Sequence, residues 1–333
     1  MSQATVLSSW GRAIRRALDR AGVDSARLFA EAGLDTAALA DPDARYPLDN
    51  TTRLWNLAAA ATGDPAFGLA VATQVTQTTF HALGYALGAS GTLREAFERM
   101  VRYFRLVTDA AELKFERDGE AYRFDIGYAP GAQPADEAVD AFVSLFLRFC
   151  RSRVGRDFAP LRVRLRRPPP ARGERFAAVF RCPIEFAAAG NTVWFAQAPF
   201  DEPLPDANPE LARHNDEVVL RYLARFDRGN LRTRVRACLV ELLPGGEPSA
   251  VKVADALHMS LRSLQRKLAD EDSSFDRLLN DTREELAVSY LGDARYSIGE
   301  VTFLLGFADA SAFGRAFRRW RGCTPTEFRT RGK

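Results

Sequence analysis

A pattern that occurs twice near the C-terminus constrains the fold of this chain more than any other feature. Residues 253–268 and 301–317 align as two copies, with Val253 opposite Val301 and a one-residue insertion in the second copy. In each copy, apolar residues recur at helical spacing on both sides of a short break. The pattern predicts two helices joined by a tight turn, repeated after about 48 residues.

The second helix of the first copy carries side chains suited to reading DNA. Ser260 is placed to cap this helix, because its hydroxyl can accept a free backbone N–H. Leu264 and Leu268 mark the face expected in the core. Arg262 and Arg266 point roughly the opposite way, and Gln265 lies at the edge of the leucine stripe. Arginine can pair with guanine and glutamine with adenine, so we interpret this face as a base reader in the major groove. The alternative is an ordinary solvated helix face.

The second copy differs in chemistry. Ser297 and Glu300 form a capping-box pattern, and Gly306 supplies the turn. Helical spacing places three aromatic residues in the core: Phe313, Phe317 and Trp320. Four residues are expected to face the groove, with the first and last taken as the equivalents of Arg262 and Arg266: Ala310, Ser311, Gly314 and Arg315. Such small side chains allow close approach but little hydrogen bonding, and Ala310 could meet a thymine methyl.

The two copies are therefore expected to work unequally. The first should specify sequence, while the second mainly anchors the protein on the duplex. Four residues are predicted phosphate contacts: Ser260, Lys267, Arg318 and Arg319. A long amphipathic helix over 275–291 would set the separation of the two copies, and half-sites one DNA turn apart are about 10 bp apart.

The net charge is only +3, and its distribution supports DNA binding. Residues 229–333 hold 17 Lys and Arg against 14 Asp and Glu, so the entire surplus lies in the C-terminal third. Phosphate contacts need basic clusters on one face more than a large total charge.

The larger N-terminal part mixes helical and strand patterns. Amphipathic helices are predicted over 10–39, 51–62, 67–75 and from Thr92, which opens a Thr-x-x-Glu capping box. Residues 113–126 alternate around Asp118-Gly119, which predicts a hairpin. A helix over 136–153, strands over 161–166 and 192–195, and a helix over 209–226 follow. The fold class is thus an α+β domain, residues 1–228, followed by an all-α domain, residues 229–333, with the break at 227–230.

A basic run lies on one of these strands and contains Arg162, Arg164, Arg166 and Arg167. On an alternating strand these arginines are expected to share one solvated face. A second nucleic-acid surface is the alternative.

Several classes of protein are disfavoured. The four cysteines and three histidines show no metal-ligand spacing, so no metal, disulfide or cofactor is predicted. No run approaches a membrane span, and the N-terminus lacks a secretory pattern, so a cytoplasmic, nucleoid-associated protein without a membrane partner is expected.

The C-terminal 100 or so residues resemble the DNA-binding domain of the AraC/XylS family of bacterial transcription regulators. The resemblance rests on Ser260-x-x-x-Leu264-Gln265-Arg266-x-Leu268 and on Gly306-Phe307-x-Asp309-x-Ser311-x-Phe313-x-Arg315-Ala316-Phe317-x-x-Trp320-x-Gly322-x-Thr324-Pro325-x-x-Phe328-Arg329. It implies seven helices, two helix-turn-helix units joined by a long helix, and most often an activator. The first recognition helix of the family matches at Arg262, Gln265 and Arg266, and the second at Ala310, Ser311, Gly314 and Arg315.

The N-terminal part resembles the sensing domain of the subgroup with ornithine-responsive and virulence regulators. The matching segments are 67–70, 83–86, 92–97, 102–106 and 204–209. This domain differs from the small cupin barrel of the arabinose regulator, so no sugar-binding residues are carried over. The resemblance implies a small-molecule effector, RNA polymerase as a partner and a possible homodimer.

Three functions are possible for a chain of this kind. A ligand-responsive regulator of double-stranded promoter or operator DNA is favoured, with the effector between the 115–126 hairpin and neighbouring helices. A DNA-tethered enzyme acting on a small metabolite is the alternative, but the N-terminal part lacks a P-loop, a GxSxG elbow, an HExxH motif or a carboxylate–histidine cluster. A nonspecific architectural protein fits poorly with a neutral domain of this size.

Overall fold

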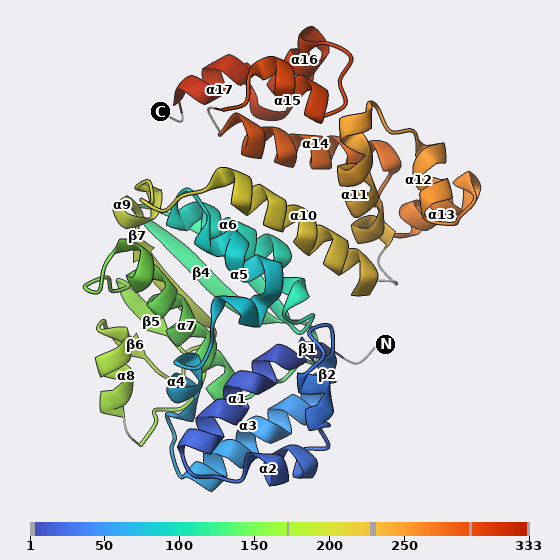
Figure 1. The fold of residues 1–333 in the computed structure, drawn as a ribbon. Helices are drawn as coiled ribbons and strands as arrows, with labels where there is room; N and C mark the ends of the chain where they lie inside the picture. Colours follow the sequence, from blue (N-terminus) through green and yellow to red (C-terminus); the bar gives the residue numbers. More distant parts are fainter. Residues whose placement is uncertain (1–3, 172, 227–230, 293–294, 332–333) are drawn as a thin grey trace. The chain divides into compact units, whose positions relative to one another are not determined.

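The computed structural model describes residues 4–171, 173–226, 231–292 and 295–331. Two compact units divide the chain, Met1–Asn208 and Pro209–Lys333 (Figure 1). This division lies before helix α10 (Pro209–Phe226), whereas the sequence placed the boundary after it. The predicted break at 227–230 lies outside the described residues. The α+β class of the first part and the helical class of the second are confirmed.

The first unit begins with a small helical layer. Its strands β1 (Thr5–Leu7) and β2 (Arg45–Pro47) form an antiparallel pair that the sequence did not reveal. The helices of this layer, as predicted, are short: α1 (Ser8–Arg20), α2 (Ser25–Glu31), η1 (Thr36–Leu39), α3 (Leu48–Thr62), α4 (Phe67–Ala72), η2 (Gln77–Phe80) and α5 (His81–Gly88). The strands are only three residues long, which explains why no alternating pattern marked them.

A five-stranded sheet forms the rest of the first unit. Its spatial order is β3-β4-β7-β5-β6, antiparallel except for the β5–β6 pair. The strands are β3 (Ala111–Asp118), β4 (Ala121–Tyr128), β5 (Arg162–Arg164), β6 (Ile184–Glu185) and β7 (Asn191–Ala196). The predicted hairpin is confirmed: Asp118 pairs with Ala121, and Gly119 takes the left-handed conformation in the two-residue loop.

Helices pack against this sheet around Phe97. They are α6 (Leu93–Tyr103), η3 (Phe104–Leu106), α7 (Asp136–Val154), α8 (Gly173–Phe180) and α9 (Gln197–Asp201). The ring of Phe97 lies 5.0–5.7 Å from five other phenylalanine rings, contributed by β3, β4, α7, β7 and α9. Edge-to-face contacts of this kind stabilise a core beyond simple burial of apolar area.

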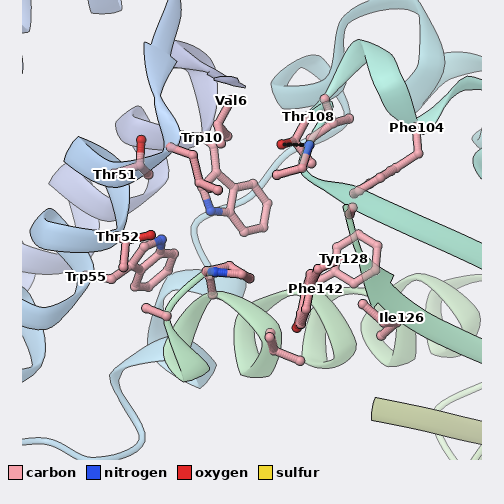
Figure 2. A pocket seen from close by; sticks show the side chains of 18 of the residues that line it. Val6, Trp10, Thr51, Thr52, Trp55, Phe104, Thr108, Ile126, Tyr128 and Phe142 are labelled. Atoms are coloured by element: carbon pink, nitrogen blue, oxygen red, sulfur yellow. Dashed lines mark hydrogen bonds between the residues drawn. The ribbon is translucent and has the colours of Figure 1, made fainter. Parts of the chain in front are cut away.

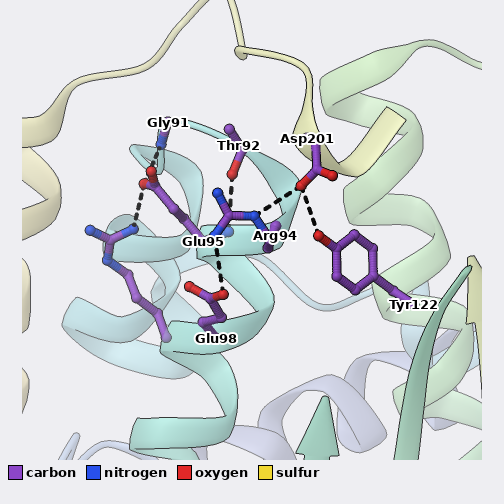
Figure 3. Close-up of polar contacts among 8 residues, drawn as sticks. Gly91, Thr92, Arg94, Glu95, Glu98, Tyr122 and Asp201 are labelled. Carbon is purple, nitrogen blue, oxygen red and sulfur yellow. Dashed lines mark hydrogen bonds and ion pairs between the residues drawn. The ribbon is translucent and has the colours of Figure 1, made fainter. Parts of the chain in front are cut away.

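The N-terminus of α6 is capped differently from the prediction (Figure 3). Thr92 accepts a hydrogen bond from the Glu95 backbone N–H, as expected, but the Glu95 carboxylate accepts from the Gly91 N–H instead of that of Thr92. Nearby, Asp201 accepts hydrogen bonds from Arg94 and from the Tyr122 hydroxyl. These contacts tie α9 to α6 and β4.

The predicted basic strand is only partly solvated. Arg162 stacks on the Trp194 ring and Arg164 pairs with Glu185, both near the surface. Arg167, by contrast, is buried and forms an ion pair with the buried Asp140 of α7. The expectation of one solvated arginine face is therefore wrong for Arg167, because the chain leaves the strand after Arg164 and turns inward.

The second unit is helical throughout its described residues. Its elements are α10, α11 (Leu231–Leu242), η4 (Leu243–Gly245), α12 (Ala250–Ala256), α13 (Leu261–Asp270), α14 (Phe275–Leu291), α15 (Ile298–Leu304), α16 (Ala310–Arg321) and α17 (Pro325–Arg331). The long helix α14 supplies Leu278 and Leu279 to one core, with α11–α13, and Tyr290 and Leu291 to a second, with α15–α17. Figure 1 shows the two helix-turn-helix pairs at opposite ends of α14.

Candidate DNA-binding surface and ligand cavity

The first helix-turn-helix is formed by α12 and α13. Ser260 caps α13 by accepting the Ser263 N–H at 3.2 Å, as predicted. Leu264 and Leu268 are fully buried against α11, α12 and α14. The opposite face of α13 presents the four predicted DNA contacts, all exposed: Arg262, Gln265, Arg266 and Lys267. Local patterning therefore produces a helix anchored by leucines with a polar outer face.

The second helix-turn-helix is formed by α15 and α16. The predicted capping box of Ser297 and Glu300 is present, and Asp309 caps α16 by accepting the Ala312 N–H at 2.7 Å. Phe313 and Phe317 are fully buried, while Trp320 is only half-buried.

The register of the two recognition helices corrects one equivalence. Leu261 and Ala310 are each the first helical residue after a capping side chain. Arg262 therefore corresponds to Ser311, and not to Ala310, whereas Arg266 corresponds to Arg315. Ala310, Ser311 and Arg315 are exposed and Gly314 is half-buried. At the positions expected to read bases, α16 thus offers one hydroxyl and one guanidinium where α13 offers three long polar side chains.

The two turns share one backbone geometry although their residues differ. His258 has φ 55° in the first turn and Gly306 has φ 67° in the second. In both, the following residue donates its N–H five residues back, Met259 to Ala254 and Phe307 to Thr302. A Cβ on Gly306 would lie 2.6 Å from the Gly246 carbonyl oxygen, so glycine is required there by contact as well as by conformation.

The recognition helices carry cations without protein partners. Among the described residues, six exposed basic side chains on these two helices form no ion pair or hydrogen bond: Arg262, Arg266, Lys267, Arg315, Arg318 and Arg319. Other arginines of the same unit are paired, among them Arg236 with Glu285 and Arg321 with Glu284. Other exposed cations of the unit, such as Arg232 and Lys252, also lack a partner in the described chain, but α13 and α16 each carry three, where an anionic backbone could neutralise them.

Arg283 links the two helix-turn-helix units and was not singled out by the sequence. Its guanidinium, from the middle of α14, donates to the Leu305 and Gly306 carbonyls at 2.9 and 3.0 Å. It also pairs with Glu247, in the loop before α12, and stacks over Phe307. An arginine on a charged helix face gives no sequence signal for this role, which depends on what tertiary structure brings next to it.

A cavity of about 90 Å³ lies in the first unit (Figure 2). Residues of α1, α3, β4, α7 and the segment after η3 surround it, including Trp10, Trp55, Thr108, Tyr128 and Phe142. The lining contains no Asp, Glu, Lys or Arg residue. The cavity could therefore hold a small apolar group with a few directed polar contacts.

The cavity lies at one end of the hairpin on which the effector was expected. Ile126 and Tyr128, at the open end of β4, line it. Near the loop end, Phe115 instead packs on Tyr122 and Phe200 at 4.9 and 5.8 Å, so that part of the expected seam is filled by aromatic rings.

No group of three or more potential metal-binding side chains occurs among the described residues. None of the helices in the described ranges is both long and apolar enough to span a bilayer.

Comparison with known proteins agrees with this architecture. Residues 22–204 match a family model described as the arabinose-binding domain of AraC transcription regulator, and residues 253–331 match a helix-turn-helix domain model. The Ornithine utilization regulator of Pseudomonas aeruginosa is 31% identical, over 92% of this chain and 91% of that protein. The uncharacterized HTH-type transcriptional regulator Rv1395 of Mycobacterium tuberculosis is 30% identical, over 93% of this chain and 92% of its own length.

A solved structure shares the fold. The crystal structure of transcriptional regulator CdpR from Pseudomonas aeruginosa superposes with a TM-score of 0.50, at 23% identity, over 96% of this chain and 97% of that chain. The matched models and relatives are all transcription regulators, so the expectation of a regulator rather than an enzyme is confirmed. This chain belongs to the AraC family of transcription regulators.

Proposed function

We propose that this regulator binds a specific double-stranded promoter or operator site through α13 and α16, and that a small organic effector in the first unit controls it. The observation that carries the proposal is the set of unpaired cations on the two recognition helices. Three unpaired cations clustered on each of two capped helices match what a polyanionic ligand requires.

The two helices are proposed to divide the work. Arg262, Gln265 and Arg266 read bases, while Ala310, Ser311 and Gly314 let α16 approach closely and Arg315 adds a base contact. Phosphates are contacted by the remaining predicted set: Ser260, Lys267, Arg318 and Arg319. The exposed faces of α13 and α16 support this division.

Effector control is proposed for the first unit. The cavity and the family membership support a sensing role, and the family supports activation through RNA polymerase, dimerisation through the first unit and action in the cytoplasm. We retain 1–228 and 229–333 as sensing and DNA-binding segments, with α10 preceding their junction. Control requires that the effector bind two states of the protein with different affinity.

The test is selection of DNA from a random pool by the purified full chain. We expect an enriched sequence with two half-sites about 10 bp apart, the better defined of which is read by α13. Arg266→Ala should weaken binding to that sequence by about 1–3 kcal/mol and relax one position, with little change on random DNA. Arg16→Ala, on an exposed face of α1, is the control and should select the same sequence.

The proposal fails if no sequence is enriched, or if Arg266→Ala weakens selected and random DNA equally. Genome-wide binding of the tagged protein, with and without candidate metabolites, then tests effector control and names the target genes. Unchanged occupancy with every metabolite would argue against effector control while leaving DNA recognition intact.

A further inference from the structure

Two tryptophans face the cavity of the first unit with unused hydrogen-bond donors. Trp10 and Trp55 are only 6% and 1% exposed. Within the described residues, neither indole N–H has an acceptor. In Figure 2 the nitrogen of each ring lies on the side turned toward the other tryptophan. A ligand that enters the cavity displaces water from these N–H groups, so it must supply an acceptor of its own or leave the donors unsatisfied.

The threonine hydroxyls of the cavity have already used their donors, and the Tyr128 hydroxyl accepts a hydrogen bond from the Asn191 side-chain amide. The Thr51 hydroxyl donates to the Pro47 carbonyl at 3.0 Å, and that of Thr108 to the Thr5 carbonyl at 2.8 Å. The Thr108 oxygen also accepts the Ala110 N–H. The cavity therefore offers donors, from two indoles, and few free acceptors.

Charge is missing from the lining as well. No acidic or basic side chain lines the cavity, and Tyr128 stays neutral because burial raises its pKa. A charged ligand would lose its hydration here without gaining a counter-charge, and that loss is large. The other walls are apolar, for example the Phe80 ring stacked 5.6 Å from Trp10.

We propose, resting on the effector control proposed above, that this cavity binds an uncharged small-ring or branched aliphatic group bearing one hydrogen-bond acceptor, held by the indole N–H groups of Trp10 and Trp55. The volume of about 90 Å³ suits such a group, since an apolar cavity of about 150 Å³ holds benzene. Ornithine brings ammonium groups and a carboxylate, and arabinose brings several hydroxyl donors. Neither compound finds matching partners in this lining, although the matched family model is described as arabinose-binding and one relative is named as an ornithine utilization regulator.

The test follows the indole N–H signals of the ¹⁵N-labelled full chain by NMR. The chain has four tryptophans, and Phe variants assign their signals. Three matched probes are titrated: cyclopentanone, cyclopentane, which lacks the acceptor, and cyclopentanecarboxylate, which adds charge. We expect cyclopentanone to shift the Trp10 and Trp55 signals and to bind about fivefold more tightly than cyclopentane, the value of one hydrogen bond. The carboxylate should bind at least tenfold more weakly than the ketone.

Variants separate the hydrogen bonds from the cavity itself. Trp55→Phe should reduce the preference for ketone over hydrocarbon, whereas Trp194→Phe, which removes an N–H bonded to Asp118 outside the cavity, should not. Ala138→Leu fills the cavity and should abolish the shifts from both neutral probes. Circular dichroism and DNA binding check that each variant folds. If Ala138→Leu does not fold, the comparison of Trp55→Phe with Trp194→Phe still tests the proposal.

Equal shifts from ornithine, arabinose or the carboxylate would overturn the inference, as would unmoved Trp10 and Trp55 signals with both neutral probes at millimolar concentration. Specific binding of cyclopentanone without any effect on DNA binding would support the cavity assignment and count against effector control. A metabolite that changes DNA binding while both signals stay still would refute the cavity assignment and leave effector control standing.

Discussion

At the scale of single residues, the most informative distinction is between paired and unpaired arginines. On α16, Arg318 is exposed without a partner in the described chain, while Arg321 pairs with Glu284 at 2.9 Å. The sequence shows both only as members of one basic cluster. Which of them is available to DNA depends on α14, which places Glu284 beside one and not the other.

This difference predicts unequal salt effects. Arg318→Ala should weaken binding on every DNA sequence and reduce the slope of log K against log salt by about 1, because one released counterion is lost. Arg321→Ala is the matched control on the same helix and should change the slope less, since Glu284 already neutralises its charge. Fluorescence anisotropy across a salt series measures both, and an unchanged slope for Arg318→Ala would remove that residue from the interface.

The buried pair of Arg167 and Asp140 makes a second prediction. Arg167→Met keeps an apolar stem but removes the charge, and at pH 9, where Asp140 is ionised, it should lower the free energy of unfolding by about 3 kcal/mol, because Asp140 loses its partner. Arg164→Met, three residues earlier on an exposed pair, should cost less than about 1 kcal/mol. Urea unfolding compares the two, and equal losses would contradict the structure.

The same pair gives a pH dependence. Burial raises the pKa of Asp140 to about 8, and Arg167 opposes this rise. A carboxyl whose pKa is raised in the folded state makes stability fall as pH rises from the unfolded pKa to the folded one. Arg167→Met removes the opposing charge and so raises the pKa of Asp140 in the folded state further. The stability of this variant therefore continues to fall at pH values above about 8, where the stability of the parent protein levels off. The difference in unfolding free energy should widen between pH 6 and pH 9, and a constant difference would argue against this account.

At the scale of elements, helices were predicted better than their ends and partners. The recognition helices, α14 and the hairpin are where the sequence placed them, because their periodicity is strong and their caps are local. Two predictions were wrong: that the Glu95 side chain caps the Thr92 N–H, and that Ala310 is the equivalent of Arg262. Each depends on a shift of one residue at a helix start, which periodicity does not resolve.

The helix-turn-helix turns predict opposite tolerance to substitution. Gly306→Ala combines a left-handed backbone with a Cβ that meets the Gly246 and Leu243 carbonyl oxygens, so it should cost about 2–4 kcal/mol. His258 occupies the matching position with φ 55°. His258→Gly relieves the backbone strain of this conformation but increases the conformational entropy of the unfolded chain, so it should change the free energy of unfolding by less than about 1 kcal/mol. Urea unfolding checks both, and a harmless Gly306→Ala would show that the turn can rearrange.

At the scale of the whole molecule, the two helix-turn-helix units are joined by one helix that enters both cores. Leu278 and Leu279 belong to the first core, and Tyr290 and Leu291 belong to the second. Arg283 lies between these two pairs along α14 and donates a hydrogen bond to the Leu305 carbonyl. This continuity predicts a fixed separation between the two recognition helices.

The fixed separation can be tested on DNA. Inserting about five base pairs between the half-sites puts them on opposite faces of the duplex, since one turn takes about 10 bp. We expect affinity to fall to that of one half-site, because the second half-site then faces away from α16. An insertion of a full turn serves as a control for spacing on the same face. Unchanged affinity after the half-turn insertion would mean that the two units move independently.

The sequence by itself determined the identity of the DNA-binding part, because capping residues, helical spacing and the repeat are local and lie close together in the chain. Tertiary structure alone decided which charges remain unpaired, that Arg167 is buried, that Arg283 links the two halves of the second unit and where the first unit is hollow. Each of these depends on residues far apart in the sequence, such as Trp10 with Phe142 or Asp140 with Arg167. Burial and partner choice are set when such segments pack, and no local pattern carries that information.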